Sequence, residues 1–92
     1  MSKIVVKSDI HVSSFSYLGN VHCLGNFEVD GDVVIYGNLT VEKDISINGS
    51  CFVKNLDCDG NIDISGQLSC KKLRRKNNSN FNSTVKIGYD ID

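Results

Sequence analysis

The sequence predicts an all-β protein, a triangular β-solenoid in which short strands stack coil upon coil. Glycines recur every six residues, at positions 19, 25, 31 and 37. The units between them alternate apolar and polar residues, which is the period-two pattern of a strand. Every third unit repeats this pattern after 17 or 18 residues, which predicts three strands per coil. We expect one solenoid domain over residues 1–92.

Each unit supplies two apolar residues, at its third and fifth positions, that are expected to point into the solenoid. A helix is excluded because residues two apart point to different sides of a helix. The Gly-Asn and Gly-Asp steps between units are expected to turn the chain where φ is positive. The expected interior pairs are Ile4/Val6, Ile10/Val12, Phe15/Tyr17, Val21/Cys23, Phe27/Val29, Val33/Ile35, Leu39/Val41, Ile45/Ile47, Cys51/Val53, Leu56/Cys58, Ile62/Ile64 and Leu68/Cys70.

Stacking every third unit defines the register, with each strand parallel to the strand one coil earlier. The interior rows run through residues 4, 21, 39, 56 and 73, through 10, 27, 45 and 62, and through 15, 33, 51, 68 and 85. About five coils of 17–18 residues follow, about 4.8 Å apart as in any sheet. The pattern weakens over residues 71–84, where we predict a polar loop at about residues 76–82. Val85 and Ile87 then resume the third row, and Ile91 the first.

Composition and charge exclude several functional classes. Lys plus Arg number 10 and Asp plus Glu 11, so a strongly basic nucleic-acid binder is excluded and no nucleic-acid partner is expected. No apolar run approaches the roughly 18 residues that span a bilayer, and the N-terminus is too short and polar for a signal peptide. We expect a cytoplasmic protein, with the inner face of the membrane as a further location.

The four cysteines fall at interior positions rather than in a metal-binding or disulfide pattern. Positions 23, 51, 58 and 70 contain no C-x-x-C pair of the kind that binds zinc. In the stack, Cys23 and Cys58 lie two coils apart and Cys51 and Cys70 are diagonal neighbours, beyond the ~7 Å limit for a disulfide. We predict free, buried, unreactive thiols, and we expect no metal and no cofactor.

Few residues suggest catalysis. His11 and His22 are expected to point outward on different faces, and neither has an evident partner within hydrogen-bonding reach. Glu28 and Asp63 share an outward row with Ser46 between them, where a weak cation site is the alternative to a solvated surface. The sequence contains no phosphate-binding glycine loop and no Ser/His/Asp arrangement. We therefore do not expect an enzyme.

Three surfaces are candidates for interactions. The first coil is expected to expose uncapped strand edges and apolar side chains, which template pairing with another chain; its candidate self-association residues are Ile4, Val6 and Ile10. An outward apolar patch is a candidate partner face, made by Val34, Tyr36 and Phe52. A basic cluster is a candidate contact for anions or a membrane surface, or a charged guard of the C-terminal end; it comprises Lys71, Lys72, Arg74, Arg75 and Lys76.

The run GNVHCLGNFEVDGDVVIYGNLTVEKDISINGS, with its V-x-I-x-G-x-L-x-V phasing, resembles the bactofilins, a family of polymer-forming bacterial cytoskeletal proteins. The resemblance covers roughly residues 4–75. It implies a right-handed triangular β-helix that assembles end to end into non-polar filaments without nucleotide. It also implies a scaffold for cell shape, polarity or the placement of wall enzymes, with itself and other scaffold or cell-envelope proteins as partners. The interrupted pattern at residues 71–84 departs from the family and leaves a head-to-head dimer as an alternative to a filament.

Two other interpretations stay open. One is a non-polymerising module that binds a protein or a membrane surface through the apolar face or the basic cluster. The other, less favoured, is an enzyme like the left-handed hexapeptide-repeat acyltransferases. Their repeat places glycine directly after the second interior residue, whereas Tyr36 intervenes here between Ile35 and Gly37.

Overall fold

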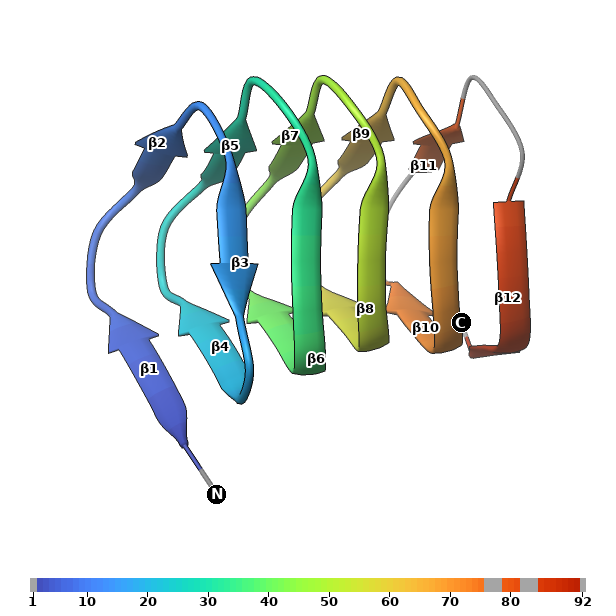
Figure 1. Cartoon of the computed structure of the whole chain (residues 1–92), viewed down its shortest axis with the longest axis horizontal. Helices are drawn as coiled ribbons and strands as arrows, with labels where there is room; N and C mark the ends of the chain where they lie inside the picture. Colours follow the sequence, from blue (N-terminus) through green and yellow to red (C-terminus); the bar gives the residue numbers. More distant parts are fainter. Residues whose placement is uncertain (1, 76–78, 82–84, 92) are drawn as a thin grey trace.

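A computed structural model describes the backbone of residues 2–75, 79–81 and 85–91, in which strands are present and helices, including any long enough to cross a membrane, are absent. Figure 1 shows the strands as a stack that grows from the N-terminal to the C-terminal end. The strands are β1 (Lys3–Val6), β2 (Ile10–Val12), β3 (Phe15–Tyr17), β4 (Asn20–Cys23), β5 (Phe27–Val29), β6 (Val33–Val41), β7 (Ile45–Ile47), β8 (Cys51–Cys58), β9 (Ile62–Ile64), β10 (Leu68–Arg75), β11 (Ser79–Phe81) and β12 (Val85–Ile91).

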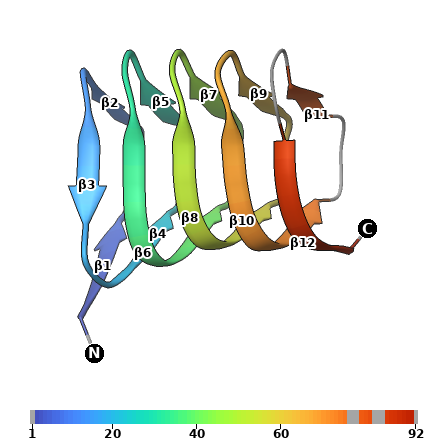
Figure 2. The ribbon, with the colours of Figure 1, turned by 45° about the vertical axis from the view of Figure 1, so that its right-hand side comes forward.

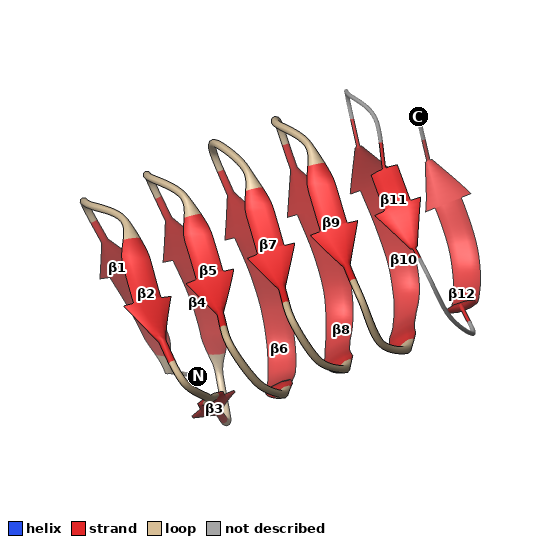
Figure 3. Cartoon of the chain, turned by 90° about the horizontal axis from the view of Figure 1, so that it is seen from above, coloured by secondary structure: helices blue, strands red, loops and turns tan. Residues whose placement is uncertain are grey.

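The strands form the three faces of a β-solenoid, and every pairing is parallel. The first face contains β1, β4 and the second halves of β6, β8 and β10. The second face contains β2, β5, β7, β9 and β11, which lie side by side in Figure 3. The third face contains β3 and the first halves of β6, β8, β10 and β12. The predicted fold class is therefore confirmed.

The coils wind in the right-handed sense. In Figures 1 and 2 the stack advances from left to right while the near strands, β3, β6, β8 and β10, run downward. A right-handed connection between parallel strands is the sense that their natural twist favours. The winding agrees with the resemblance, which implied a right-handed helix.

The strand register follows the three predicted rows. Ile4 pairs with Val21, and that row continues through Leu39, Leu56 and Leu73. The second row runs from Ile10 to Ile62, and the third from Phe15 to Val85, both as predicted.

The prediction for the last position of the first row is wrong by one residue. Leu73 pairs with Asp90, and Ile91 instead pairs with Arg74. The apolar pattern favoured Ile91. The register between β10 and β12 keeps one constant offset from Leu68 and Val85 onward, and this offset places Asp90 opposite Leu73.

Two further expectations about the C-terminal part need correction. The solenoid makes about four turns rather than the predicted five coils. The predicted polar loop at 76–82 contains strand β11, which pairs with β9, while residues 76–78 and 82 lie outside the described residues. The side chain of Phe81 is not described.

Strand β10 continues through the run where the sequence pattern weakens. The corner from Cys70 to Leu73 has two residues between its buried positions, like the corner from Val53 to Leu56. Leu73 is therefore fully buried although basic residues surround it.

The core is one continuous stack of apolar side chains along the axis. All nine predicted pairs from Val21/Cys23 to Leu68/Cys70 are buried, and no polar side chain is buried among the described residues. The first coil differs: Ile10 is buried, whereas Ile4, Val6, Phe15 and Tyr17 are half-buried. Val12, predicted to be interior, is 38% exposed because no coil covers it on its N-terminal side.

The glycines have a different role from the one predicted. No described glycine has positive φ. Instead, a Cβ at Gly49 would collide with the carbonyl group of Gly31, and a Cβ at Gly66 with that of Gly49. Glycine is therefore required because the corners of successive coils stack in close contact.

Asp and Asn side chains at the corners connect each coil to the next. Asp9 Oδ1 accepts a hydrogen bond from the backbone N–H of Asn26 at 2.7 Å, and Asp44 Oδ1 accepts one from Asn61 at 2.8 Å. Asp32 Oδ1 accepts from the Ser50 N–H at 2.9 Å. These bonds satisfy backbone donors that the short strands leave free at the corners.

Candidate functional site

The N-terminal coil presents three strand edges that no other described strand covers. β1 ends one sheet and β2 ends the other, and β3 pairs only with β6. On the opposite side each of these strands is bound to the second coil. Unpaired edges of this kind are templates for pairing with another chain.

The apolar side chains of the first coil form the floor of this open end. Ile4, Val6, Phe15 and Tyr17 occupy interior rows but are covered from one side only. The ring of Phe15 packs edge-on against that of Phe27 in the second coil, with 5.3 Å between centroids. Among the residues whose side chains are described, six large apolar residues are exposed, and four of them lie in the first 24 positions, namely Val5, Val12, Leu18 and Leu24.

The structure places the three predicted self-association residues at this end, but they differ in how far their side chains are buried. Ile4 and Val6 are half-buried, whereas Ile10 is buried. Val12, Phe15 and Tyr17 were predicted only as core residues, yet each presents apolar surface at the open end. Their position in the first coil was the sequence signal that could have identified them.

The opposite end has a different composition in the same rows. The backbone pairing places Ser79 opposite Ile62 and Asp90 opposite Leu73. Arg75 pairs with Cys58, one coil further in. At these positions the rows reach polar residue types, whereas the third row reaches Val85 opposite Leu68 and Ile87 opposite Cys70.

The predicted partner face is a shallow groove on the third face. The rings of Tyr36 and Phe52 pack edge to face with centroids 6.3 Å apart, and they are 58% and 49% exposed. Val34 is half-buried beside Phe52, its register partner. The groove has a volume of about 280 Å³, and its rim carries Lys54 and Lys71.

The predicted basic cluster is divided by the corner of β10. Lys71 lies on the aromatic groove of the third face, whereas Lys72 and Arg74 line a second hollow, of about 200 Å³, on the first face. Arg74 Nη1 lies 3.7 Å from Asp57 Oδ2. The side chains of Arg75 and Lys76 lie outside the described residues. The described basic residues do not guard the C-terminal end as expected, because β12 lies beyond β10.

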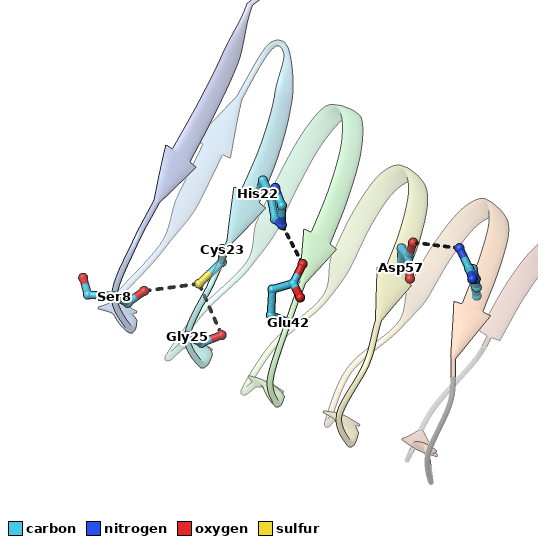
Figure 4. Close-up of polar contacts among 7 residues, drawn as sticks. Ser8, His22, Cys23, Gly25, Glu42 and Asp57 are labelled. Carbon is cyan, nitrogen blue, oxygen red and sulfur yellow. Dashed lines mark hydrogen bonds and ion pairs between the residues drawn. The ribbon is translucent and has the colours of Figure 1, made fainter.

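The histidines have partners that the sequence did not suggest. His22 Nε2 lies 2.7 Å from Glu42 Oε2, as Figure 4 shows. His11 Nε2 lies 3.3 Å from Asp30 Oδ2 and 3.9 Å from Glu28 Oε2. Each partner comes from the following coil, 17 to 20 residues away, so that local sequence patterns could not identify it.

The two histidine contacts do not combine into one catalytic or metal-binding site. His22 lies on the first face and His11 on the second, as predicted. Exposed ion pairs contribute little to stability. Glu28, Ser46 and Asp63 share the predicted outward row, and the described residues contain no group of three His, Cys, Asp or Glu side chains suited to a metal ion.

None of the four cysteines forms a disulfide and all four are buried, as predicted. Burial raises the pKa of Cys51 to about 12 and that of Cys58 to about 11, and it also raises the pKa of Cys23. The Cys23 thiol donates to the carbonyl groups of Ser8 and Gly25, both at 3.5 Å (Figure 4). Protonated, buried thiols of this kind are poor nucleophiles.

Comparison with protein-family models, curated proteins and solved structures produced no match. The β-solenoid fold is compatible with a β-helix family.

Proposed function

We propose that the protein is a structural, self-associating scaffold of the bactofilin type, which assembles end to end through its first coil and catalyses no reaction. The observation that carries this proposal is the open N-terminal end. Three unpaired strand edges there surround a floor of partly covered apolar side chains.

The physical reason is that the first coil is covered by another described coil on one side only. Inner coils are held by a coil on each side, and in solenoids these interfaces supply most of the stability. Among the described strands the first coil has one neighbouring coil, and Val12 and the half-buried Ile4 and Val6 are in partial contact with water. A second copy stacked on this end would pair the strand edges and cover the apolar rows.

The bactofilin assignment rests on the sequence resemblance together with the triangular, right-handed winding. A cytoplasmic location, with contact at the inner membrane face, belongs to the same proposal. The partners proposed are further copies of the chain and, beyond them, other scaffold or cell-envelope proteins.

Sedimentation velocity over a range of protein and salt concentrations, with negative-stain imaging, tests the proposal. Wild-type protein is expected to form dimers or filaments. Val6→Lys, which puts a charge on the apolar floor, is expected to leave monomers. The matched control is Ser46→Lys, because Ser46 is exposed on the outer surface of β7 in an inner coil. Monomeric wild-type protein at high concentration would contradict end-to-end assembly.

A specific observation favours one alternative function. The aromatic groove brings Tyr36 and Phe52 together with Lys54 and Lys71, so that two separately predicted surfaces meet. In that case the protein is a binding module for an acidic, apolar partner. Tyr36→Ala with Phe52→Ala would then abolish binding while leaving the state of assembly unchanged.

A further inference from the structure

We infer that the aromatic groove of the third face is a docking site for an extended peptide segment of a partner protein, in which an acidic residue follows two positions after an aromatic residue. The residues that line the groove include Tyr36, Phe52, Lys54, Ser69 and Lys71. This inference rests on the second candidate function, the binding module, and does not depend on end-to-end assembly. It specifies the chemical class of the partner and the two contacts that recognise it.

The open end of the solenoid does not explain the exposed aromatic pair. Tyr36 and Phe52 are 58% and 49% exposed, whereas the other exposed large apolar residues among the described side chains lie in the first 24 positions. The pair belongs to β6 and β8, each of which is paired on both sides. A second copy stacked on the first coil would therefore leave both rings in water. Exposed aromatic rings beside a hollow are the kind of residue that contributes most to binding at protein interfaces.

The size of the hollow favours a side chain over a larger ligand. Its volume of about 280 Å³ lies below the roughly 300–1,000 Å³ of sites that enclose small molecules and cofactors. On the neighbouring strand the register partner of Phe52 is Ser69, whose short side chain leaves space beside the ring. An aromatic side chain of a partner can fill this space and pack against Phe52.

Two lysines determine the charge of the partner. Lys54 and Lys71 are both exposed, and no carboxylate among the described residues forms an ion pair with either. The register between β8 and β10 places Lys71 one coil after Lys54, with about 4.8 Å between the two strands. Like charges on neighbouring strands repel one another. A partner carboxylate bound between the two ammonium groups offsets this repulsion.

The other two faces do not offer the same combination. The outward row through Phe52 has no carboxylate among its described side chains, whereas the outward row of the second face contains Glu28 and Asp63. On the first face, Arg74 already lies 3.7 Å from Asp57. Within the described part of the chain, the third face is therefore the one that combines lysines lacking a carboxylate partner with exposed aromatic rings.

The spacing of ring and lysine determines the spacing within the partner segment. Phe52 and Lys54 are exposed on β8 with the buried Val53 between them, so they lie on the same side of the strand, about 6.6 Å apart. An extended peptide has the same period, and its residues i and i+2 point to one side. An aromatic residue at i therefore contacts Phe52 while an acidic residue at i+2 reaches the two lysines.

The number of charges favours a peptide over a membrane surface. Electrostatic attachment to anionic lipids typically uses a cluster of about four to eight basic residues. The groove supplies two, because Lys72 and Arg74 line the separate hollow on the first face. A hollow also receives a protruding side chain, which a partner peptide presents and a flat layer of lipid headgroups does not.

Equilibrium dialysis of the wild-type protein against short blocked peptides tests the inference, because the groove stays open in monomers and oligomers alike. The probe Gly-Phe-Ser-Glu-Gly is expected to bind, and to bind less as salt screens the lysines. Gly-Ala-Ser-Glu-Gly and Gly-Phe-Ser-Lys-Gly are each expected to bind about tenfold more weakly. The spacing control Gly-Phe-Glu-Ser-Gly, whose acid points to the opposite side, should also bind more weakly than the probe.

Variants of the protein locate the binding site. Phe52→Ala should weaken binding of the probe by about tenfold. Lys54→Glu combined with Lys71→Glu should abolish binding of the probe and confer binding of Gly-Phe-Ser-Lys-Gly, a gain that a misfolded variant would not show. The matched control is Lys43→Glu, which makes the same change of charge at an exposed position outside the groove and should bind the probe as the wild type does.

The outcomes separate the docking site from self-association. Absence of probe binding, equal binding of all four peptides, or binding that the double lysine reversal leaves unchanged would each overturn the docking site, whatever sedimentation shows. Wild-type monomers that bind the probe would overturn end-to-end assembly and leave the docking site. Binding to phosphatidylserine vesicles that requires Phe52, with no binding of the probe, would assign the groove to a membrane surface and overturn the inference.

Discussion

The first and third coils have the same pattern of residues but different surroundings. In the third coil, Leu39 and Ile47 are buried between two neighbours. In the first coil, Ile4 of the same row as Leu39 is half-buried, and Val12 of the same row as Ile47 is 38% exposed. The repeat therefore determines where a side chain points, and the number of neighbouring coils determines how much that side chain stabilises the fold.

The largest expected effect is a difference in the free energy of unfolding between two side-chain truncations in the same interior row. Leu39→Ala should lower the free energy of unfolding by ~2–5 kcal/mol, because it leaves a cavity between two coils. Ile4→Ala should lower it by only about 1 kcal/mol, because its side chain is partly in water already. Urea unfolding in a Val6→Lys background, where assembly does not contribute, measures both. Equal losses would show that the first coil is as well covered as the third.

The corner glycines test whether close backbone stacking between inner coils contributes to stability. Gly49→Ala should destabilise by ~1–3 kcal/mol, because its Cβ collides with the carbonyl group of Gly31 and the coils must separate. Lys43→Ala, at another corner of the same solenoid, is the control and should have little effect. Thermal unfolding of both variants tests this prediction. A Gly49→Ala variant as stable as the wild type would contradict it.

The buried thiols predict a loss of stability at alkaline pH. Burial raises the pKa of Cys51 from 9.0 to about 12, so above pH 9 the unfolded chain binds fewer protons than the folded chain. The free energy of unfolding should therefore fall as the pH rises from 9 towards 12. Cys51→Val should reduce this slope, measured by urea unfolding at several pH values. An unchanged slope would mean that Cys51 is not the group responsible.

The smallest expected effect concerns the side-chain bonds between coils. Asp44→Ala removes the acceptor for the Asn61 N–H and should cost about 1 kcal/mol. Asp63→Ala, an exposed carboxylate on the outer surface of β9, is the matched control and should be nearly neutral. Urea midpoints compare the two. Equal losses would show that the corner bond adds nothing beyond surface charge.

Period and apolar pattern were sufficient to predict the three faces, the strand rows and the burial of the interior pairs from Val21/Cys23 to Leu68/Cys70. They failed where an interaction depends on neighbouring coils rather than on local pattern. Positive φ was expected at the glycines, but the requirement is the close approach of the corner one coil away. The carboxylates that contact His11 and His22 were missed for the same reason.

The candidate site was predicted only in outline. The open N-terminal coil follows from the repeat, but the sequence alone did not show that Ile10 is buried while Val12 is exposed. The end of the solenoid was also misjudged, because Ile91 fitted the apolar pattern better than Asp90, which occupies the row.

Concentration-dependent hydrogen exchange tests the central claim most directly, namely that the open N-terminal coil is the surface of self-association. Backbone amide protection is measured for residues 3–17 and, as an internal reference, for the third coil at residues 38–54. Protection of the first coil is predicted to rise with protein concentration while that of the third coil stays constant. Protection of residues 3–17 that does not change with concentration, in a protein that sediments as an oligomer, would contradict the account.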